Sequence, residues 1–570
     1  MNAPDQTLLS LLRRDRRLGI QSDSSSIVSP LSLSLLAMLM ALVAGLVLPM
    51  LPDSRNSRLS AGVAIVVAYV FFCGRFVLQH RQLQQQAKRN NFSHDAKQDA
   101  SDVQPVLIAC ASQTGYADQL AQQTAGALEA AGMAVRVLPL ALLDAALMRQ
   151  SRQILFIIST SGEGDAPDNA TAFVRTLMAH SLALPHLQYA ILALGDRHYQ
   201  HYCAFGHRLQ HWLQQQQAQA MFDLLEVDNG EQKALHHWQT QLGTLSGQRS
   251  MASWISPGYH HWTLTERRLL NPGSSGAPVF HLALAASDTA VCWQAGDIAE
   301  IGPMNALPAV EHYLAQAALP GDALVRIGQQ SCSLREHLRS RLLLPEAMIT
   351  MAKLTEKLAA AQALADALPA LPARAYSIAS VSSDGQLELL VRQVRQADGQ
   401  LGLGSGWLTQ HAVCGSQIAL RVRDNRSFHA PPDDRPLILI GNGTGLAGLR
   451  AHLKQRQQRG QQRNWLFFGE RSAQHDYFYQ EEIRQWQASG LLQGCDIVFS
   501  RDQAQRLYVQ DQLACHADRI QRWVAAGAAI YVCGSKEGMA AAVTAQLGAI
   551  LGQEQLEKMK EQGDYRRDVY

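Results

Sequence analysis

The feature that most constrains the fold of this chain is a series of short apolar runs separated by segments with helical patterning. The runs start at Val106 and read VLIAC, AVRVL, ILFIIST and YAILALG. Apolar strands that alternate with helices predict a parallel sheet covered by helices on both faces. We therefore expect a doubly wound α/β domain over residues 105–246.

The composition leaves room for further domains and excludes some classes of partner. The 570 residues allow three or four domains, at roughly 150 residues for each. A hydrophobic share of 47% with 17% charged residues excludes disorder of the whole chain. The net charge of +2 gives no electrostatic reason to expect a nucleic-acid partner. Neither the nine cysteines nor the 20 histidines show metal-ligand spacing, so we expect no metal site.

Two apolar runs near the N-terminus have the length of membrane spans. Residues 31–51 carry no charge and would cover about 31 Å as a helix, the thickness of a bilayer's hydrocarbon core. Residues 61–78 form the second run, in which Arg75 is the only charged residue. We expect a transmembrane helical hairpin over residues 31–80; the alternative is a cleaved signal peptide.

The basic residues around these runs predict an orientation. Four arginines precede the hairpin within residues 1–30, and further basic residues follow it within residues 81–104. Basic residues stay on the cytoplasmic side of a membrane. We therefore expect a cytoplasmic tail over 1–30, a polar linker over 81–104, and a two-pass location in the inner or plasma membrane with the later domains facing the cytoplasm.

Three loops rich in hydroxyl groups and glycine follow strands of the first α/β domain. They would meet at the carboxyl edge of the sheet, where ligands bind in doubly wound folds. Hydroxyls, backbone N–H groups and a helix N-terminus suit a phosphate, although Ser and Thr also simply cap helices. The candidates are Ser112, Gln113, Thr114, Gly115, Tyr116 and Ala117, then Ser159, Thr160, Ser161, Gly162, Glu163 and Gly164, and finally Leu194, Gly195, Asp196 and Tyr199.

The pattern changes after about residue 255 to short β-like runs. They predict an antiparallel barrel over residues 255–430 with a short helical insert at about 305–368. Within the run RAYSIAS, we expect Arg374, Tyr376 and Ser377 to share one face of a strand. That face would suit a diphosphate together with an aromatic ring.

A second α/β pattern, over residues 432–570, contains a dinucleotide motif. A strand at 437–440 runs into the loop of Gly443, Thr444 and Gly445, and a helix follows. Glu470 further along would favour NADH, because its carboxylate could accept from a ribose hydroxyl. We nevertheless expect NADPH, because guanidinium and hydroxyl groups that suit a 2′-phosphate follow a later strand. These residues are Ser500, Arg501, Arg506, Tyr508 and Gln510.

Taken together, these segments resemble the diflavin reductase family over about residues 105–570. The three loops are similar to those of its flavodoxin-like domain, which implies bound FMN with Tyr199 stacked on the flavin. RAYSIAS resembles the FAD signature of the ferredoxin-NADP reductase family. This implies Arg374 on the pyrophosphate, Tyr376 against the isoalloxazine ring and Ser377 beside its reactive edge.

The resemblance implies further residues around FAD and NADPH. The loop of Gly402, Gly404 and Ser405 is similar to a second pyrophosphate loop, and the residues from Ser500 to Gln510 resemble a 2′-phosphate pocket. The implied catalytic residues are Ser377, Cys533 and Asp568. Tyr570 matches the aromatic residue that covers the FAD ring until nicotinamide displaces it.

The function implied by the resemblance is that of a membrane-anchored NADPH-dependent oxidoreductase. Electrons would pass from NADPH to FAD, then to FMN, and then to a separate haem or iron–sulfur protein. The alternatives are the flavoprotein component of a sulfite reductase and a ferric-chelate or free flavin reductase. A degenerate scaffold without activity is disfavoured because glycines and arginines are intact in every loop.

Overall fold

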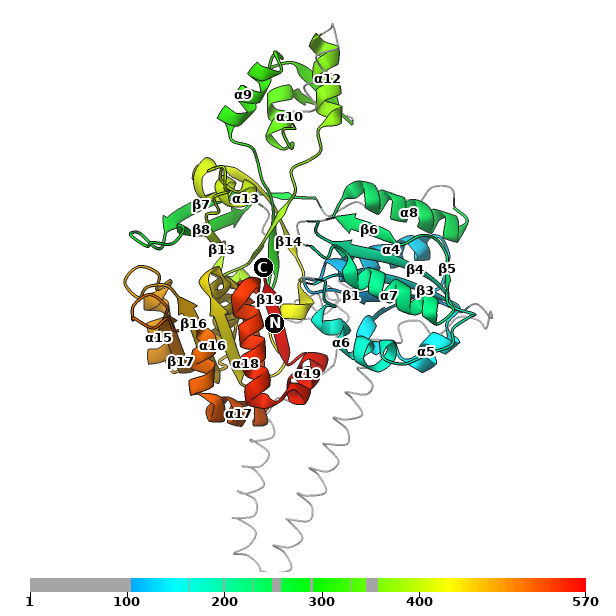
Figure 1. Ribbon diagram of the computed structural model, residues 1–570. Coiled ribbons are helices and arrows are strands. Elements are labelled where there is room, and N and C mark those ends of the chain that lie inside the picture. The colour runs from blue at the N-terminus through cyan, green and yellow to red at the C-terminus, as the bar shows by residue number, and fades with distance from the viewer. Residues whose placement is uncertain are drawn as a thin grey trace, which may run out of the picture. The chain divides into compact units, whose positions relative to one another are not determined.

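The computed structural model describes residues 104–161, 164–197, 200–228, 230–248, 258–287, 291–328, 330–344 and 357–570. All of them belong to one compact unit of the chain, Val103–Tyr570. The described residues form three large sheets, namely a parallel sheet, an antiparallel barrel and a second parallel sheet, together with one two-stranded sheet (Figure 1).

The first sheet is parallel and doubly wound, as the sequence predicts. Its strand order is β2-β1-β3-β4-β5, and β6 pairs with β4. The strands are β1 (Val106–Ala111), β2 (Val135–Pro139), β3 (Gln153–Ser159), β4 (Gln188–Gly195), β5 (Gln219–Ala220) and β6 (Leu225–Asp228).

Alternate residues of β1 enter two different cores, which explains why the apolar run is continuous. Ile108 packs with residues of α4 (Tyr116–Ala130) and α8 (Gln232–Ser246). Its neighbour Ala109 faces the opposite core, which contains residues of α7 (Ala204–Gln215). A strand that is buried on both faces has no place for a polar residue, so it cannot show the alternation of a half-exposed strand.

The second sheet is a six-stranded antiparallel barrel. Its order is β12-β9-β14-β7-β8-β13, and a bridge between Ile378 and Leu389 joins the two end strands. The strands are β7 (His260–Leu269), β8 (Val279–Ala286), β9 (Ile298–Gly302), β12 (Arg374–Ser377), β13 (Leu387–Arg392) and β14 (Gln417–Arg423).

A small insert lies between β9 and β12 and has a hydrophobic core of its own. Its helices are accompanied by a β-hairpin, which the sequence analysis does not anticipate. The elements are α9 (Leu307–Gln316), β10 (Leu324–Ile327), β11 (Gln330–Ser333), α10 (Leu334–Arg339) and α12 (Lys357–Ala367).

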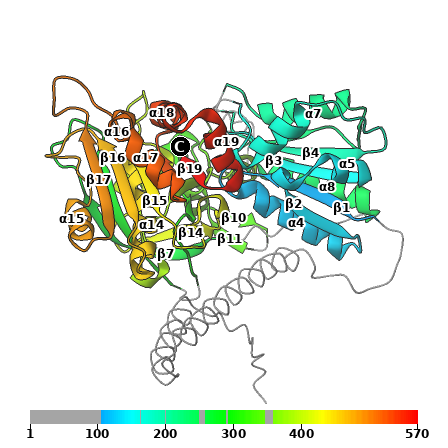
Figure 2. The ribbon, with the colours of Figure 1, turned by 90° about the horizontal axis from the view of Figure 1, so that it is seen from below.

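The third sheet is parallel, with the order β17-β16-β15-β18-β19. One core contains residues of α14 and α15, and the opposite core contains residues of α16 to α19 (Figure 2). The strands are β15 (Leu437–Asn442), β16 (Asn464–Glu470), β17 (Leu492–Phe499), β18 (Ala529–Gly534) and β19 (Tyr565–Val569). The helices are α14 (Leu446–Gln458), α15 (Gln480–Ala488), α16 (Val509–Cys515), α17 (Ala517–Ala525), α18 (Ala541–Leu551) and α19 (Gln553–Gln562).

One expectation from the sequence, the location in the inner or plasma membrane, requires correction. Among the helices that the structure describes, none has the length and apolarity of a membrane span. The longest of these, α4 and α8, have 15 residues, or about 22 Å against the roughly 30 Å of a bilayer core. The runs at 31–51 and 61–78, on which the expectation depended, lie outside the described residues. The two-pass membrane location is therefore withdrawn.

The central strand of the third sheet offers a test of this packing. Leu439 lies in β15 with 0% exposure, whereas Leu324 in the insert is 70% exposed. We expect Leu439→Ala to lower the free energy of unfolding by about 2–5 kcal/mol, because it leaves a cavity between packed layers. Leu324→Ala should change it by less than about 0.5 kcal/mol. Calorimetry on both variants checks this, and equal effects would contradict the assignment of β15 to the core.

Candidate functional site

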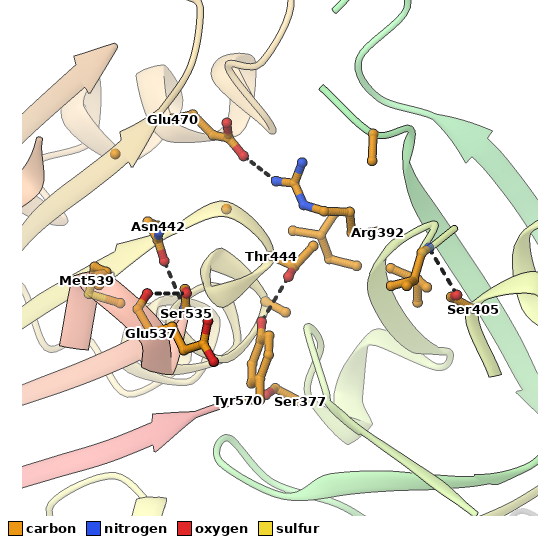
Figure 3. A pocket seen from close by; sticks show the side chains of 18 of the residues that line it. Ser377, Arg392, Ser405, Asn442, Thr444, Glu470, Ser535, Glu537, Met539 and Tyr570 are labelled. Carbon is orange, nitrogen blue, oxygen red and sulfur yellow. Dashed lines mark hydrogen bonds and ion pairs between the residues drawn. The ribbon is translucent and has the colours of Figure 1, made fainter. Parts of the chain in front are cut away.

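A cavity of about 1100 Å³ lies where the barrel meets the carboxyl ends of β15 and β16 (Figure 3). Its volume is large enough for more than one drug-sized ligand. The structure brings together at this cavity most of the residues that the sequence analysis assigns to FAD and NADPH. They are Arg374, Tyr376, Ser377, Gly402, Gly404, Ser405, Gly443, Thr444, Ser500, Arg501, Tyr508, Gln510 and Tyr570.

Close packing of side chains against the backbone explains why residue 404 is a glycine. A Cβ atom at Gly404, in α13 (Leu403–Gly406), would lie 2.6 Å from the hydroxyl oxygen of Tyr376 and 2.7 Å from Cγ of Arg374. No other residue fits there without moving one of these side chains. Gly404 therefore keeps an arginine and an aromatic ring beside a bare backbone loop, which is a cradle suited to a diphosphate.

Ser377 does not share a face with Arg374 and Tyr376, which corrects the expectation from the sequence. Arg374 and Tyr376 both approach Gly404, whereas the hydroxyl of Ser377 donates to Asp568. Adjacent residues of a strand point to opposite faces, and only residues two apart share one. The side chains of Arg374 and Tyr376 therefore lie against Gly404. The hydroxyl of Ser377 contacts Asp568 instead.

Ser377, Cys533 and Asp568 form a buried cluster from three different strands. The Ser377 hydroxyl donates to Oδ2 of Asp568 at 2.5 Å, and the Cys533 thiol lies 3.8 Å from the same oxygen. Burial raises the pKa of the Cys533 thiol well above its ordinary value, and the charge of Asp568 raises it further. Cys533 is thus a neutral thiol that contributes packing and a weak hydrogen bond.

The charge of Asp568 is set by opposing influences. Burial raises the pKa of this carboxyl group, whereas the hydrogen bond from Ser377 and the positive charge of Arg423 lower it. Asp568 is 6% exposed. A carboxylate whose pKa lies above its ordinary value is a better proton acceptor than an exposed one.

Tight packing holds the glycine loop against this cluster. A Cβ at Gly445 would lie 2.1 Å from the carbonyl oxygen of Cys533. Asn442 adds a further link, because its side-chain oxygen accepts from the backbone N–H of Ser535 at 3.0 Å. The loop after β15 is therefore fixed to the end of β18.

Tyr570 lies at the mouth of the cavity near Ser377 (Figure 3). Its hydroxyl is 3.0 Å from that of Thr444, and it is 53% exposed. Its backbone carbonyl accepts from the N–H of Lys536. The ring is thus held at one side by hydrogen bonds and is open to solvent at the other.

At the far end of the cavity, Ser500 and Arg501 follow β17. Their N–H groups donate to the carbonyls of Glu470 and Arg471, both at 2.8 Å. Arg501 and Arg506 are exposed, and Arg506 is not among the residues that line the cavity. The structure also pairs Glu470 with Arg392 of the barrel, an arginine that the sequence analysis did not single out because it lies 78 residues away from its partner.

The loops of the first sheet form a second group of candidates. The hydroxyl of Ser112 accepts from the N–H of Ala117, and that of Thr160 accepts from Phe205. Both hydroxyls thus accept from N–H groups in the first turns of α4 and α7, although the N-cap residues of these helices are Gly115 and Cys203. Gly162, Glu163 and Tyr199 lie outside the described residues, so the predicted stacking role of Tyr199 stays a prediction.

Gln113 and Gly115 of the first loop contact later parts of the chain. The Gln113 amide donates to Asp168 and to the backbone carbonyl of Arg567, at 3.0 and 3.1 Å. Gly115 has a φ of +77°, and a Cβ there would lie 2.6 Å from the carbonyl oxygen of Asp424. The first loop therefore lies against β19 and against the segment after β14. The cradle at Gly404 fits a diphosphate, and the hydroxyl and guanidinium groups of Ser500 and Arg501, which line the same cavity, fit a phosphate.

Comparison with known proteins finds two families that match separate parts of the chain. The flavodoxin family matches residues 108–238, and the oxidoreductase NAD-binding domain family matches residues 439–545. The chain is 30% identical to the sulfite reductase [NADPH] flavoprotein alpha-component of Yersinia enterocolitica, over 82% of this chain and 90% of the relative. It is 28% identical to proteins of that name from Vibrio cholerae, over 82% and 87%, and from a Shewanella species, over 83% and 91%.

The raised pKa of Asp568 predicts a pH-dependent gain in stability when its charge is removed. The folded state binds the proton of Asp568 more readily than the unfolded state does, so ionisation destabilises the fold as the pH rises above the ordinary value of 3.8. We expect Asp568→Asn to melt at a higher temperature than the natural chain at pH 7, with the difference vanishing below about pH 4.

Asp433 provides a control for which the opposite change in melting temperature is expected in the same measurements. Its hydrogen bond from Arg435 lowers the pKa of its carboxyl group. Asp433→Asn should therefore lower the melting temperature at pH 7, and this loss should also fade as the pH falls through the natural group's pKa. A destabilised Asp568→Asn at pH 7 would show that the Asp568 carboxylate stabilises the fold, against our interpretation.

Proposed function

Because this chain belongs to the diflavin reductase family, we propose that it passes electrons from NADPH, through FAD and FMN, to a separate haem protein or other redox protein. The chain is an NADPH-dependent oxidoreductase, and its cofactors are FMN, FAD and NADPH. What we propose is the identity of the electron acceptor. We also propose the division predicted from the sequence, with FMN at 105–246, FAD at 255–430 and NADPH at 432–570.

The observation that carries the proposal is the contact of Ser377, which lines the cavity, with Asp568 and Cys533, which are buried and do not line it. The three residues come from the barrel and from two strands of the third sheet, so they lie where a flavin held by the barrel and a nicotinamide held by the sheet would meet. When bound, the nicotinamide supplies a hydride, and the two flavins convert a two-electron reaction into one-electron steps. The protein supplies positions and protons.

We assign the following roles around the reaction centre. Asp568 accepts the Ser377 hydrogen bond and so holds that hydroxyl in one orientation, in which it would face the edge of a bound flavin. The raised pKa of the carboxyl group makes it a suitable group to hold a proton during hydride transfer. Tyr570 would cover the face of a bound flavin and exclude water from it, and a bound nicotinamide would have to displace this ring.

The cofactor phosphates would be held by the cradles at either end of the cavity. Arg374, beside Gly404, would bind the pyrophosphate of FAD. Ser500, Arg501 and Tyr508 line the other end, where they would bind the 2′-phosphate of NADPH. Arg506 is a candidate for a second positive charge there.

The names of the relatives favour one acceptor in particular. Several relatives of this chain are called flavoprotein alpha-components of sulfite reductase, and a component of that kind acts with another component. We therefore propose a haem-containing protein as the partner, with the electron-accepting component of a sulfite reductase as the first candidate.

Cofactor content and acceptor reduction test the proposal directly. Purified chain should release FMN and FAD in equal amounts on denaturation, and NADPH should then drive the reduction of cytochrome c, used as a model haem protein. Recovery of FAD alone, or NADPH oxidation without reduction of the haem protein, would contradict electron transfer through two flavins.

Removing the charge of Arg501 tests the assignment of the 2′-phosphate. We expect Arg501→Ala to lower kcat/KM for NADPH by roughly tenfold to a hundredfold and to leave kcat/KM for NADH nearly unchanged, because only NADPH carries the phosphate. Arg522→Ala is the matched control, since Arg522 is exposed on α17 and does not line the cavity. Equal losses with both nucleotides would argue against this pocket.

A further inference from the structure

An ion pair crosses the cavity from the barrel to the third sheet. Arg392 ends β13, and Glu470 ends β16. Nη2 of Arg392 lies 2.5 Å from Oε1 of Glu470 (Figure 3). The side chain of Glu470 is only 4% exposed and that of Arg392 is 27% exposed. Both residues line the cavity.

Both oxygens of the Glu470 carboxylate have partners. Oε1 accepts from Arg392, and Oε2 accepts from the backbone N–H of Arg471 at 2.8 Å. A buried carboxylate needs such partners, because an unpaired buried charge is costly. Of these two partners, Arg392 carries a compensating positive charge, whereas the other is a neutral backbone N–H group.

Glu470 belongs to the end of the cavity that we assign to the 2′-phosphate. Its backbone carbonyl accepts from the N–H of Ser500 at 2.8 Å, and the next carbonyl accepts from Arg501. The register of the sheet also pairs Glu470 with Phe499, the residue just before Ser500. The carboxylate and the proposed phosphate ligands are therefore neighbours on adjacent strands.

This neighbourhood creates a conflict of charge. A carboxylate at the end of the second strand of a dinucleotide-binding sheet accepts from a ribose hydroxyl and repels a 2′-phosphate. The side chain of Arg392 removes both effects at once, because it neutralises the carboxylate and occupies one of its oxygens.

We propose that Arg392 is a specificity-determining residue, which allows the cavity to accept NADPH by masking the carboxylate of Glu470. The inference rests on the proposed use of NADPH. It adds a residue of the FAD-binding barrel to the determinants of nucleotide choice, which are otherwise found in the third sheet. In the absence of Arg392, Glu470 faces the nucleotide with an unbalanced negative charge and favours NADH.

Four variants of the full-length, flavin-loaded protein test this proposal through the ratio of kcat/KM for NADPH to that for NADH. The assays are run at pH 8, because burial raises the pKa of the Glu470 carboxyl group and a higher pH favours its charged form. We expect Arg392→Ala to lower the ratio by about tenfold or more, as one unmasked charge near a phosphate dianion should. Arg392→Lys retains the positive charge and should keep the ratio within about threefold.

The double variant Arg392→Ala/Glu470→Gln separates masking from direct binding. With no carboxylate to mask, the ratio should return to within about threefold of the natural value. If Arg392 bound the 2′-phosphate itself, the ratio would stay low. If it bound the pyrophosphate common to both nucleotides, or only joined the two domains, both kcat/KM values would fall together and the ratio would not change. Either result would overturn the proposal.

Glu388→Gln is the matched control. Glu388 lies on the same strand as Arg392 and pairs with Arg450 of α14, outside the residues that line the cavity. Loss of that ion pair should leave the ratio unchanged. If Arg392→Ala does not fold, the single variant Glu470→Gln takes over the test: a ratio that stays or rises supports masking, and a ratio that falls overturns it.

The outcomes also distinguish this inference from the function on which it rests. A natural chain that does not oxidise NADPH, or that prefers NADH, would refute the proposed function. A natural chain that prefers NADPH, together with an Arg392→Ala variant of unchanged ratio, would refute the masking role alone.

Discussion

The hydrogen bond from Ser377 to Asp568 is the interaction on which the rest of the site depends. It joins the barrel to the third sheet, and it does so at a carboxyl group that is almost completely buried. Burial makes the charged form of Asp568 costly, so the group needs the hydroxyl of Ser377 and the positive charge of Arg423. The barrel and the third sheet both contribute to this buried interaction, so it holds them in one relative position. The cavity between them takes its shape from that position.

The packing around Cys533 reinforces the same geometry without any charge. Gly445 and Gly448 approach the carbonyl oxygen and the sulfur atom of Cys533 so closely that a Cβ at either position would lie 2.1 or 3.2 Å away. The glycines of the dinucleotide motif thus have two effects. They leave the backbone accessible to a ligand, and they let α14 pack closely against β18. A side chain at position 445 would collide with the backbone of Cys533.

The sequence predicts the sheets because their signals are local. Apolar runs such as that of β1, with glycine loops after them, indicate buried parallel strands whichever residues they later contact. The carboxyl-edge loops and most of the residues that line the cavity could be named for the same reason. Contacts between distant segments leave no such signal. The pairing of Arg392 with Glu470 spans 78 residues, and that of Gln113 with Arg567 spans 454.

Strand β19 shows how charge can fix the register of an edge strand. Arg567 points toward Asp168, which follows the third strand of the first sheet, while its neighbour Asp568 points toward Ser377. A slip of one residue along β18 would turn each side chain to the opposite face. The arginine would then enter the buried centre, and one carboxylate would confront another at Asp168. The alternation of a cation and an anion therefore makes the misaligned strand unfavourable in two ways, because it would bury an arginine and bring two carboxylates together.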